Sequence, residues 1–160
     1  MSTRCQIEFQ TKTRDELAKD LVLERRLIYQ HSNGDPDSVL PCLRKFFEWN
    51  IDRATGKSYA DRVCYTAANY VYWSKRNLEK HFDEESAKTG FGVCNVRELE
   101  PDIEFFYIVR TNVTYSRSEF KGLRTHLDTR VTCFEAKKRY PKKPCLHKIR
   151  EEPLFAVGAS

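Results

Sequence analysis

The chain has no long hydrophobic run. Its longest uninterrupted apolar stretch is FFYIV, residues 105–109, whereas a helix that crosses a bilayer needs about 20 apolar residues. The opening residues MSTRCQIEF also lack the basic stretch followed by an apolar stretch that marks a secretory signal. We therefore expect a cytoplasmic protein that does not enter membranes.

Common catalytic and metal-binding motifs are missing as well. The chain contains no C-x-x-C, G-x-S-x-G or H-E-x-x-H pattern. ATGKS at residues 54–58 matches the end of a phosphate-binding loop, but Ile51 stands where that motif needs its first glycine. Cys145 and His147 would supply only two of the four ligands of a usual structural zinc site. We expect no cofactor and no metal.

The cysteines show no sign of a disulfide framework. Most of them occupy positions with an apolar pattern, so we expect reduced thiols that pack as small hydrophobic groups. The six are Cys5, Cys42, Cys64, Cys94, Cys133 and Cys145.

The composition fits one folded domain. A chain of 160 residues that is 40% hydrophobic and 32% charged can bury roughly 70% of the surface that its unfolded form exposes. No repeat and no linker divides it. We expect a single domain over residues 1–136, followed by a basic, proline-containing segment over residues 137–160.

The first half of the chain predicts strand, helix, strand and helices. Cys5, Ile7 and Phe9 alternate with polar residues, which indicates a half-buried strand. Thr13 and Glu16 have the spacing of a capping box, which predicts a short helix from about Thr13. A strand follows over about residues 26–31, and helices follow to about residue 50 and over roughly residues 59–82.

The second half predicts mainly strands. FGVCN and RVTCFEA read as strands, and DIEFFYIVR, which is apolar on both faces at its centre, reads as a central strand. TNVTYS reads as a turn or hairpin, and the last 24 residues as a tail or an edge element. The expected fold class is α+β: a mostly antiparallel sheet with two to three helices packed on one face.

The segment HSNGDPDSVLPCL, residues 31–43, admits two interpretations. If Ser38 caps the following helix, Pro41 falls in its first turn and Asp35 and Asp37 lie beside the positive end of the helix dipole. Alternatively, His31 with Asp35 or Asp37 is a catalytic pair of base and orienting carboxylate. Ser2, which removal of Met1 would expose, is a further candidate nucleophile.

The positive charge is concentrated near the C-terminus. Residues 116–150 carry 11 Lys and Arg against 3 Asp and Glu, a net charge of +8, whereas residues 1–115 carry 17 against 18. Phosphate recognition uses mobile cations and stacking aromatic rings, and an acidic protein surface would attract the same charges. The candidate binding residues are Lys137, Lys138, Arg139, Tyr140, Lys142, Lys143, Lys148 and Arg150.

Three functions follow from these patterns. The basic segment predicts a non-enzymatic binding protein that contacts nucleic acid or an acidic protein partner. A small hydrolase that uses His31 with Asp35 or Asp37, or Ser2, is the second hypothesis, and an inhibitor of the phage type that acts by protein–protein contact is the third.

Several segments occur in an order that resembles a known group. They are MSTRCQIEF, IYQHSNGDPDSVLPCLRKFFEWN, AANYVYWSKR, GFGVCN and DIEFFYIV, and they span roughly residues 1–110. This order is similar to that of a group of small uncharacterised bacterial and phage proteins. The resemblance implies a compact α+β fold and a cytoplasmic origin, and members of the group have a hairpin where this chain inserts TKTRDELAKD. No activity is attached to the group, and the basic segment lies outside the resemblance.

Overall fold

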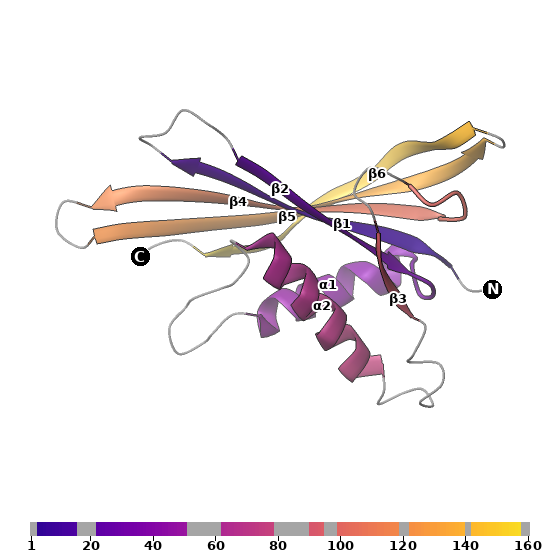
Figure 1. The fold of residues 1–160 in the computed structure, drawn as a ribbon, viewed down its shortest axis with the longest axis horizontal. Coiled ribbons are helices and arrows are strands. Elements are labelled where there is room, and N and C mark those ends of the chain that lie inside the picture. The colour runs from indigo at the N-terminus through magenta and orange to yellow at the C-terminus, as the bar shows by residue number, and fades with distance from the viewer. Residues whose placement is uncertain are drawn as a thin grey trace.

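One mixed sheet with two helices on one face makes up the described chain, as the computed structural model shows (Figure 1). The structure describes residues 3–15, 22–50, 62–78, 90–94, 99–118, 122–139 and 142–157. The predicted α+β class is confirmed. The elements are β1 (Cys5–Asp15), β2 (Val22–Gln30), α1 (Pro36–Trp49), α2 (Val63–Leu78), β3 (Phe91–Cys94), β4 (Phe105–Ser118), β5 (Gly122–Arg139) and β6 (Lys142–Val157).

The sheet has the strand order β3-β2-β1-β4-β5-β6. Strand β1 pairs with β2 in the antiparallel sense and with β4 in the parallel sense, and the other neighbours are antiparallel. The predicted central strand, β4, therefore lies inside the sheet, between β1 and β5.

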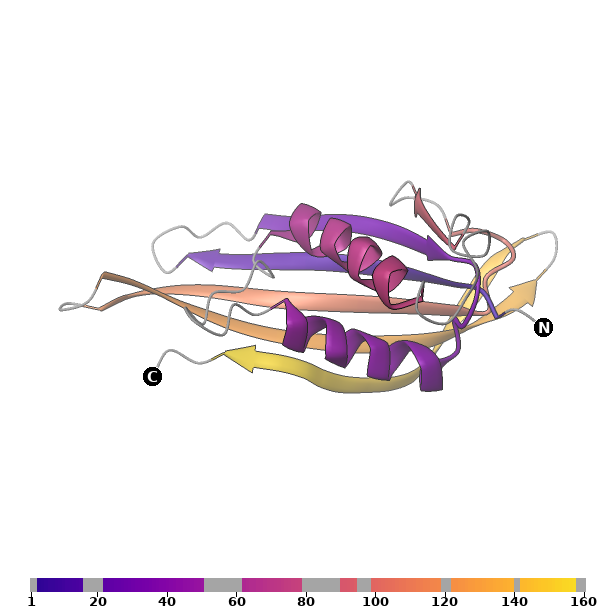
Figure 2. The same ribbon diagram turned by 90° about the horizontal axis from the view of Figure 1, so that it is seen from below.

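The two faces of the sheet differ in character because successive side chains of a strand point to opposite sides. On β1, Cys5, Ile7 and Phe9 are buried against the helices, and the ring of Phe9 lies 6.5 Å from that of Phe46 on α1. We call this side the inner face. Figure 2 shows both helices lying across it. Gln6 and the other even-numbered residues of β1 point to the opposite side, which we call the outer face.

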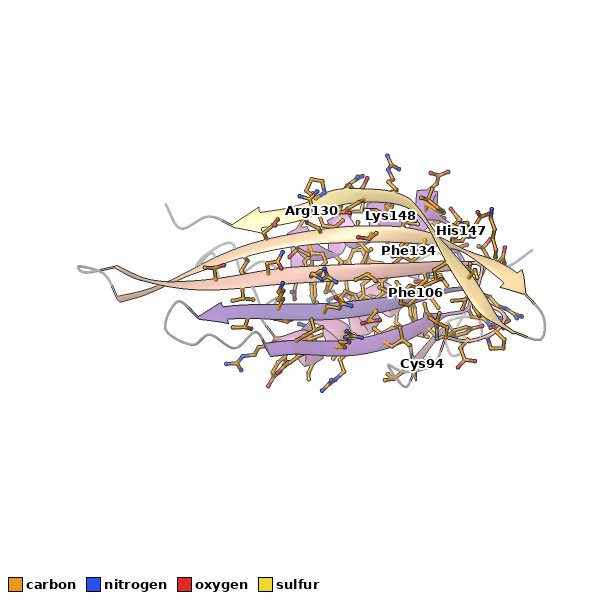
Figure 3. All side chains as sticks on the ribbon, turned by 90° about the horizontal axis from the view of Figure 1, so that it is seen from above. Cys94, Phe106, Arg130, Phe134, His147 and Lys148 are labelled. Carbon is orange, nitrogen blue, oxygen red and sulfur yellow. The ribbon has the colours of Figure 1, made fainter. Side chains whose placement is uncertain are left out.

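A second, smaller apolar cluster lies on the outer face at one end of the sheet. The buried residues of this cluster are Leu27, Ile103, Phe106 and Ala136. Leu99, from the chain before β4, packs against them. The backbone N–H of Glu100 donates to Gln6 Oε1 over 3.1 Å, which ties this cover to β1. The remainder of the described outer face carries no helix (Figure 3).

Helix α1 begins earlier than the sequence pattern predicted. Asp35, not Ser38, is the N-cap, and its Oδ1 accepts a hydrogen bond from the Ser38 N–H over 3.0 Å. Pro36 occupies the first helical position, where its fixed φ suits a helix start. The prediction that Ser38 caps the helix and that Pro41 lies in its first turn is therefore wrong, because Pro41 lies inside α1.

Two further local predictions are wrong for one reason. Thr13 lies in β1 rather than at the start of a helix, and residues 111–116 belong to β4 rather than to a turn. Each segment is paired with a strand on both sides, since Thr13 faces both Val22 and Val113 in the sheet. Tertiary pairing has thus overridden the local capping pattern. Residues 16–21 lie outside the described part of the chain.

The described part of the basic segment is not a tail: residues 137–139 end β5, and residues 142–157 form the edge strand β6. Strand β5 passes position 136 without a break, and β6 pairs with β5 as the last strand of the sheet. The edge alternative is therefore confirmed. No helix in the described residues is long and apolar enough to cross a membrane.

All six cysteines are free. Cys5 and Cys133 are buried in the inner core, where burial raises the pKa of both thiols. Cys64 is exposed on α2, which contradicts its predicted role as a packed apolar group.

Candidate nucleic-acid interface

The three residues of the predicted catalytic site, His31, Asp35 and Asp37, lie between the end of β2 and the first turn of α1. Both carboxylate oxygens of Asp35 accept hydrogen bonds from Ser38. Oδ1 accepts from the Ser38 backbone N–H, and Oδ2 accepts from the Ser38 hydroxyl over 2.9 Å. Asp37 is exposed in the first turn of α1, beside the positive end of the helix dipole. His31 is exposed, and its backbone N–H donates to the Gly90 carbonyl. The structural role of Asp35 is that of a helix cap.

His31 belongs to a polar corner at the end of the sheet. Its ring lies 6.2 Å from that of Tyr29, and Tyr29 donates a hydrogen bond to Asp102 Oδ2, which also pairs with Arg4. Burial and the neighbouring Asp102 carboxylate raise the pKa of Tyr29, so its hydroxyl stays a donor. Among the described residues no three His, Cys, Asp or Glu side chains are placed to hold a metal ion.

The candidate nucleophile Ser2 and several predicted binding residues lie beyond the described side chains. Ser2 and Tyr140 are outside the described residues altogether. For four basic residues the structure places the backbone in β5 or β6 but leaves the side chain undescribed; these are Lys138, Arg139, Lys142 and Lys143.

The remaining predicted cations divide between the two faces. Lys148 faces Phe134 in the sheet and lies on the outer face, whereas Arg150 faces Cys133 and lies on the inner face. Lys137 follows Ala136 of the outer cluster and so points to the inner side. Each has a carboxylate partner: Glu135 for Lys137, Glu151 for Lys148 and Glu152 for Arg150. The described part of the basic segment therefore does not form one continuous patch.

A row of arginines crosses the outer face instead. Gln10 on β1 faces Arg25 on β2 and Arg110 on β4, and Arg110 in turn faces Arg130 on β5. We call Arg25, Arg110 and Arg130 the arginine row. Side chains directly opposite each other on adjacent strands are about 5 Å apart at Cβ, and like charges in such a pair are destabilising. The facing pair Arg110 and Arg130 is therefore not explained by the stability of the sheet.

A chain of hydrogen bonds fixes the middle of this row. Arg110 Nε donates to Gln10 Oε1 over 2.9 Å, and Gln10 Nε2 donates to Glu8 Oε1 over 2.7 Å. Glu8 is almost fully buried and also lies 3.5 Å from Arg25 Nε. Within the described residues, Arg110 has no carboxylate at ion-pair distance. Its guanidinium is thus oriented by a neutral acceptor, and in the described part of the chain it has no ion-pair partner.

An aromatic row runs parallel to the arginine row, four residues further along the strands. It consists of Tyr29 on β2, Phe106 on β4 and Phe134 on β5, and it ends at Lys148 on β6. At about 3.3 Å per residue the two rows are about 13 Å apart. The Phe106 ring is buried and lies 6.2 Å from the partly exposed Phe134 ring. Figure 3 looks onto this face and shows Phe106, Phe134 and Lys148 in succession across the strands.

Sequence reasoning missed the arginine row because its members are scattered along the chain. Each lies at a polar position of an alternating pattern, as in YIVRTNV for Arg110 and DTRVTC for Arg130. Alternation alone places them on a solvent-facing side. Only the register of β2, β1, β4 and β5 brings them into line, and the parallel pairing of β1 with β4 has no local signal.

Comparisons of the chain with family models, with curated proteins and with solved structures gave no match.

Proposed function

We propose that the outer face of the sheet binds single-stranded nucleic acid. The observation that carries the proposal is the facing pair Arg110 and Arg130, which concentrates positive charge at a cost to the sheet. Arginine binds phosphate oxygens through a planar, bidentate fork. The outer face therefore offers two guanidinium groups that face each other on adjacent strands.

The neighbouring aromatic rings favour a single strand over a duplex or an acidic protein. Phe134 and Tyr29 are partly exposed, and unpaired bases stack on such rings with about 1–3 kcal/mol each. Bases inside a duplex are already stacked on one another and cannot stack on side chains of the sheet. An acidic protein surface would satisfy the arginines but would gain nothing specific from the rings.

Fluorescence anisotropy with labelled single-stranded RNA and DNA, each also tested as a duplex, examines this proposal. We expect the protein to bind the single strands. The logarithm of the association constant should fall linearly with the logarithm of the salt concentration, with a slope of about −0.7 for each phosphate neutralised. Arg110→Gln should lower the magnitude of that slope by about 0.7. Arg76→Gln, which removes an exposed arginine from α2 on the other side of the molecule, is the matched control and should change little.

Phe134→Leu separates stacking from charge. The leucine keeps an apolar group beside Phe106 but removes the ring, so affinity should fall about tenfold with an unchanged salt slope. The proposal fails if no single strand binds at low salt, or if Arg110→Gln and Arg76→Gln behave alike. Equal binding of polyglutamate, with no effect of Phe134→Leu, would instead assign the face to an acidic protein partner.

A further inference from the structure

Glu151 on β6 lies between two cations of the outer face. Its Oε1 is 3.4 Å from Arg130 Nε, and its Oε2 pairs with Lys148 Nζ. All three side chains are partly open to solvent, with exposed fractions of 46% for Arg130, 54% for Lys148 and 37% for Glu151. Figure 3 shows Arg130 and Lys148 near each other along β5 and β6.

An irregularity in β6 brings these groups together. Residues three apart in a regular strand point to opposite faces. Lys148 faces Phe134 and Glu151 faces Thr132, with a register shift at Ile149 between them. This extra residue, a β-bulge, places Lys148 and Glu151 on the same face as Arg130.

The arrangement matches the way in which a phosphate group is held. Each oxygen of the carboxylate contacts a different cation, as two oxygens of one phosphate do between an arginine and a lysine. The Lys148 hydrogen bond and charge, with Arg130, hold the pKa of the Glu151 carboxyl below its usual range, so it is ionised at neutral pH. Exposed ion pairs of this kind are weak, so a polyanion can displace the carboxylate.

We propose that Glu151 is an internal competitor for nucleic acid: its carboxylate occupies the position of a strand phosphate between Arg130 and Lys148, and the strand binds by displacing it. This inference rests on the proposed function of the outer face. It identifies a phosphate position beside the Phe134 ring and a residue that limits affinity there.

The variant Glu151→Gln tests the inference in the same anisotropy assay. Removing the charge leaves the shape of the side chain and frees both cations. The repulsion of one unit charge at about 4 Å in water corresponds to about a fivefold change in affinity, so the variant should bind single strands about fivefold more tightly. Its salt slope should also be steeper, because no displaced carboxylate is left to take up a cation from solution when the strand binds.

Glu135→Gln is the matched control. Glu135 is on the same hairpin and also pairs with a lysine, Lys137 at 3.9 Å, but it points to the inner face. Glu135→Gln removes the same formal charge as Glu151→Gln, so an effect of net charge alone would appear equally in both variants. We expect an affinity change of less than about twofold. Thermal melts followed by circular dichroism check that both variants are folded.

The outcomes distinguish this inference from the proposed function on which it rests. If the unchanged protein binds and Arg110→Gln weakens binding, but Glu151→Gln equals Glu135→Gln or binds more weakly than the unchanged protein, the competitor role of Glu151 is refuted and the interface stands. If neither the unchanged protein nor Glu151→Gln binds any strand, both are refuted.

Discussion

Replacement of Gly34 by alanine should destabilise the fold strongly. Gly34 lies in the turn between β2 and α1, against the start of β1. A Cβ built at this position would lie 2.8 Å from the backbone carbon of Arg4, the backbone nitrogen of Cys5 and the Cβ of Cys5. Strand β1 is paired on both sides, so it cannot move away and the turn itself must shift.

The expected loss can be worked out from the contacts of this turn. Overpacking costs about 1–3 kcal/mol. A shifted turn also weakens two hydrogen bonds of about 1 kcal/mol each, from the Gly34 N–H to Thr3 O over 2.9 Å and from the Tyr107 hydroxyl to Gly34 O over 2.8 Å. The smaller entropy of the unfolded alanine chain returns about 0.4–1 kcal/mol. The net loss in the free energy of unfolding should be about 2–4 kcal/mol.

Urea titration followed by circular dichroism measures this loss, and a thermal melt should show a fall in Tm of about 6–12 °C. Gly90→Ala is the control, because a Cβ at Gly90 meets no atom within 4 Å. Its stability should stay within about 0.5 kcal/mol of that of the unchanged protein. A Gly34→Ala protein as stable as Gly90→Ala would refute the close-approach argument.

Two further predictions concern the helix and the core. Pro41→Ala should raise the free energy of unfolding by about 1–2 kcal/mol in the same titration, because Pro41 lies inside α1, where proline lacks an N–H and crowds the carbonyl four residues earlier. A lower free energy of unfolding would mean that the rigidity of Pro41 stabilises the helix by more than these two effects destabilise it. Burial raises the pKa of the Cys133 thiol from 9.0 to about 11, so only the unfolded thiol ionises between these values. The stabilisation that this thiol provides is full below about pH 9 and is lost as the pH rises towards 11. Urea midpoints should therefore fall less over this range for Cys133→Ala than for the unchanged protein, and identical slopes would contradict the assignment.

Local sequence patterns predicted most helices and strands, but few of the contacts between residues that are distant in the sequence. The alternation of Cys5, Ile7 and Phe9 identified the inner face of β1, because the same burial that forms a strand also sets its period of two residues. The capping pattern at Thr13 failed because pairing with both Val22 and Val113 holds that residue in a strand. Local signals carry no information on such pairing.

The candidate site was likewise predicted only in part from the sequence. Net charge directed attention to the β5–β6 hairpin, and Lys148 and Arg130 do lie there. Charge counting could not tell that Arg150 faces the inner side, or that Arg110, from a neutral part of the chain, stands opposite Arg130. Face and register decide which cations act together, and the bulge at Ile149 puts Lys148 and Arg150 on opposite faces although they are two residues apart.

The parallel contact between β1 and β4 has a consequence for how the chain assembles during synthesis. Cys5 pairs with Phe105 and Asp15 with Tyr115, so one edge of β1 has no partner until the chain has been synthesised beyond residue 105 and that residue has emerged from the ribosome. Pairings between residues so distant in sequence form slowly, and an open strand edge is a template for mispairing. The nascent protein should therefore depend most on chaperones in the interval before Phe105–Ser118 arrives.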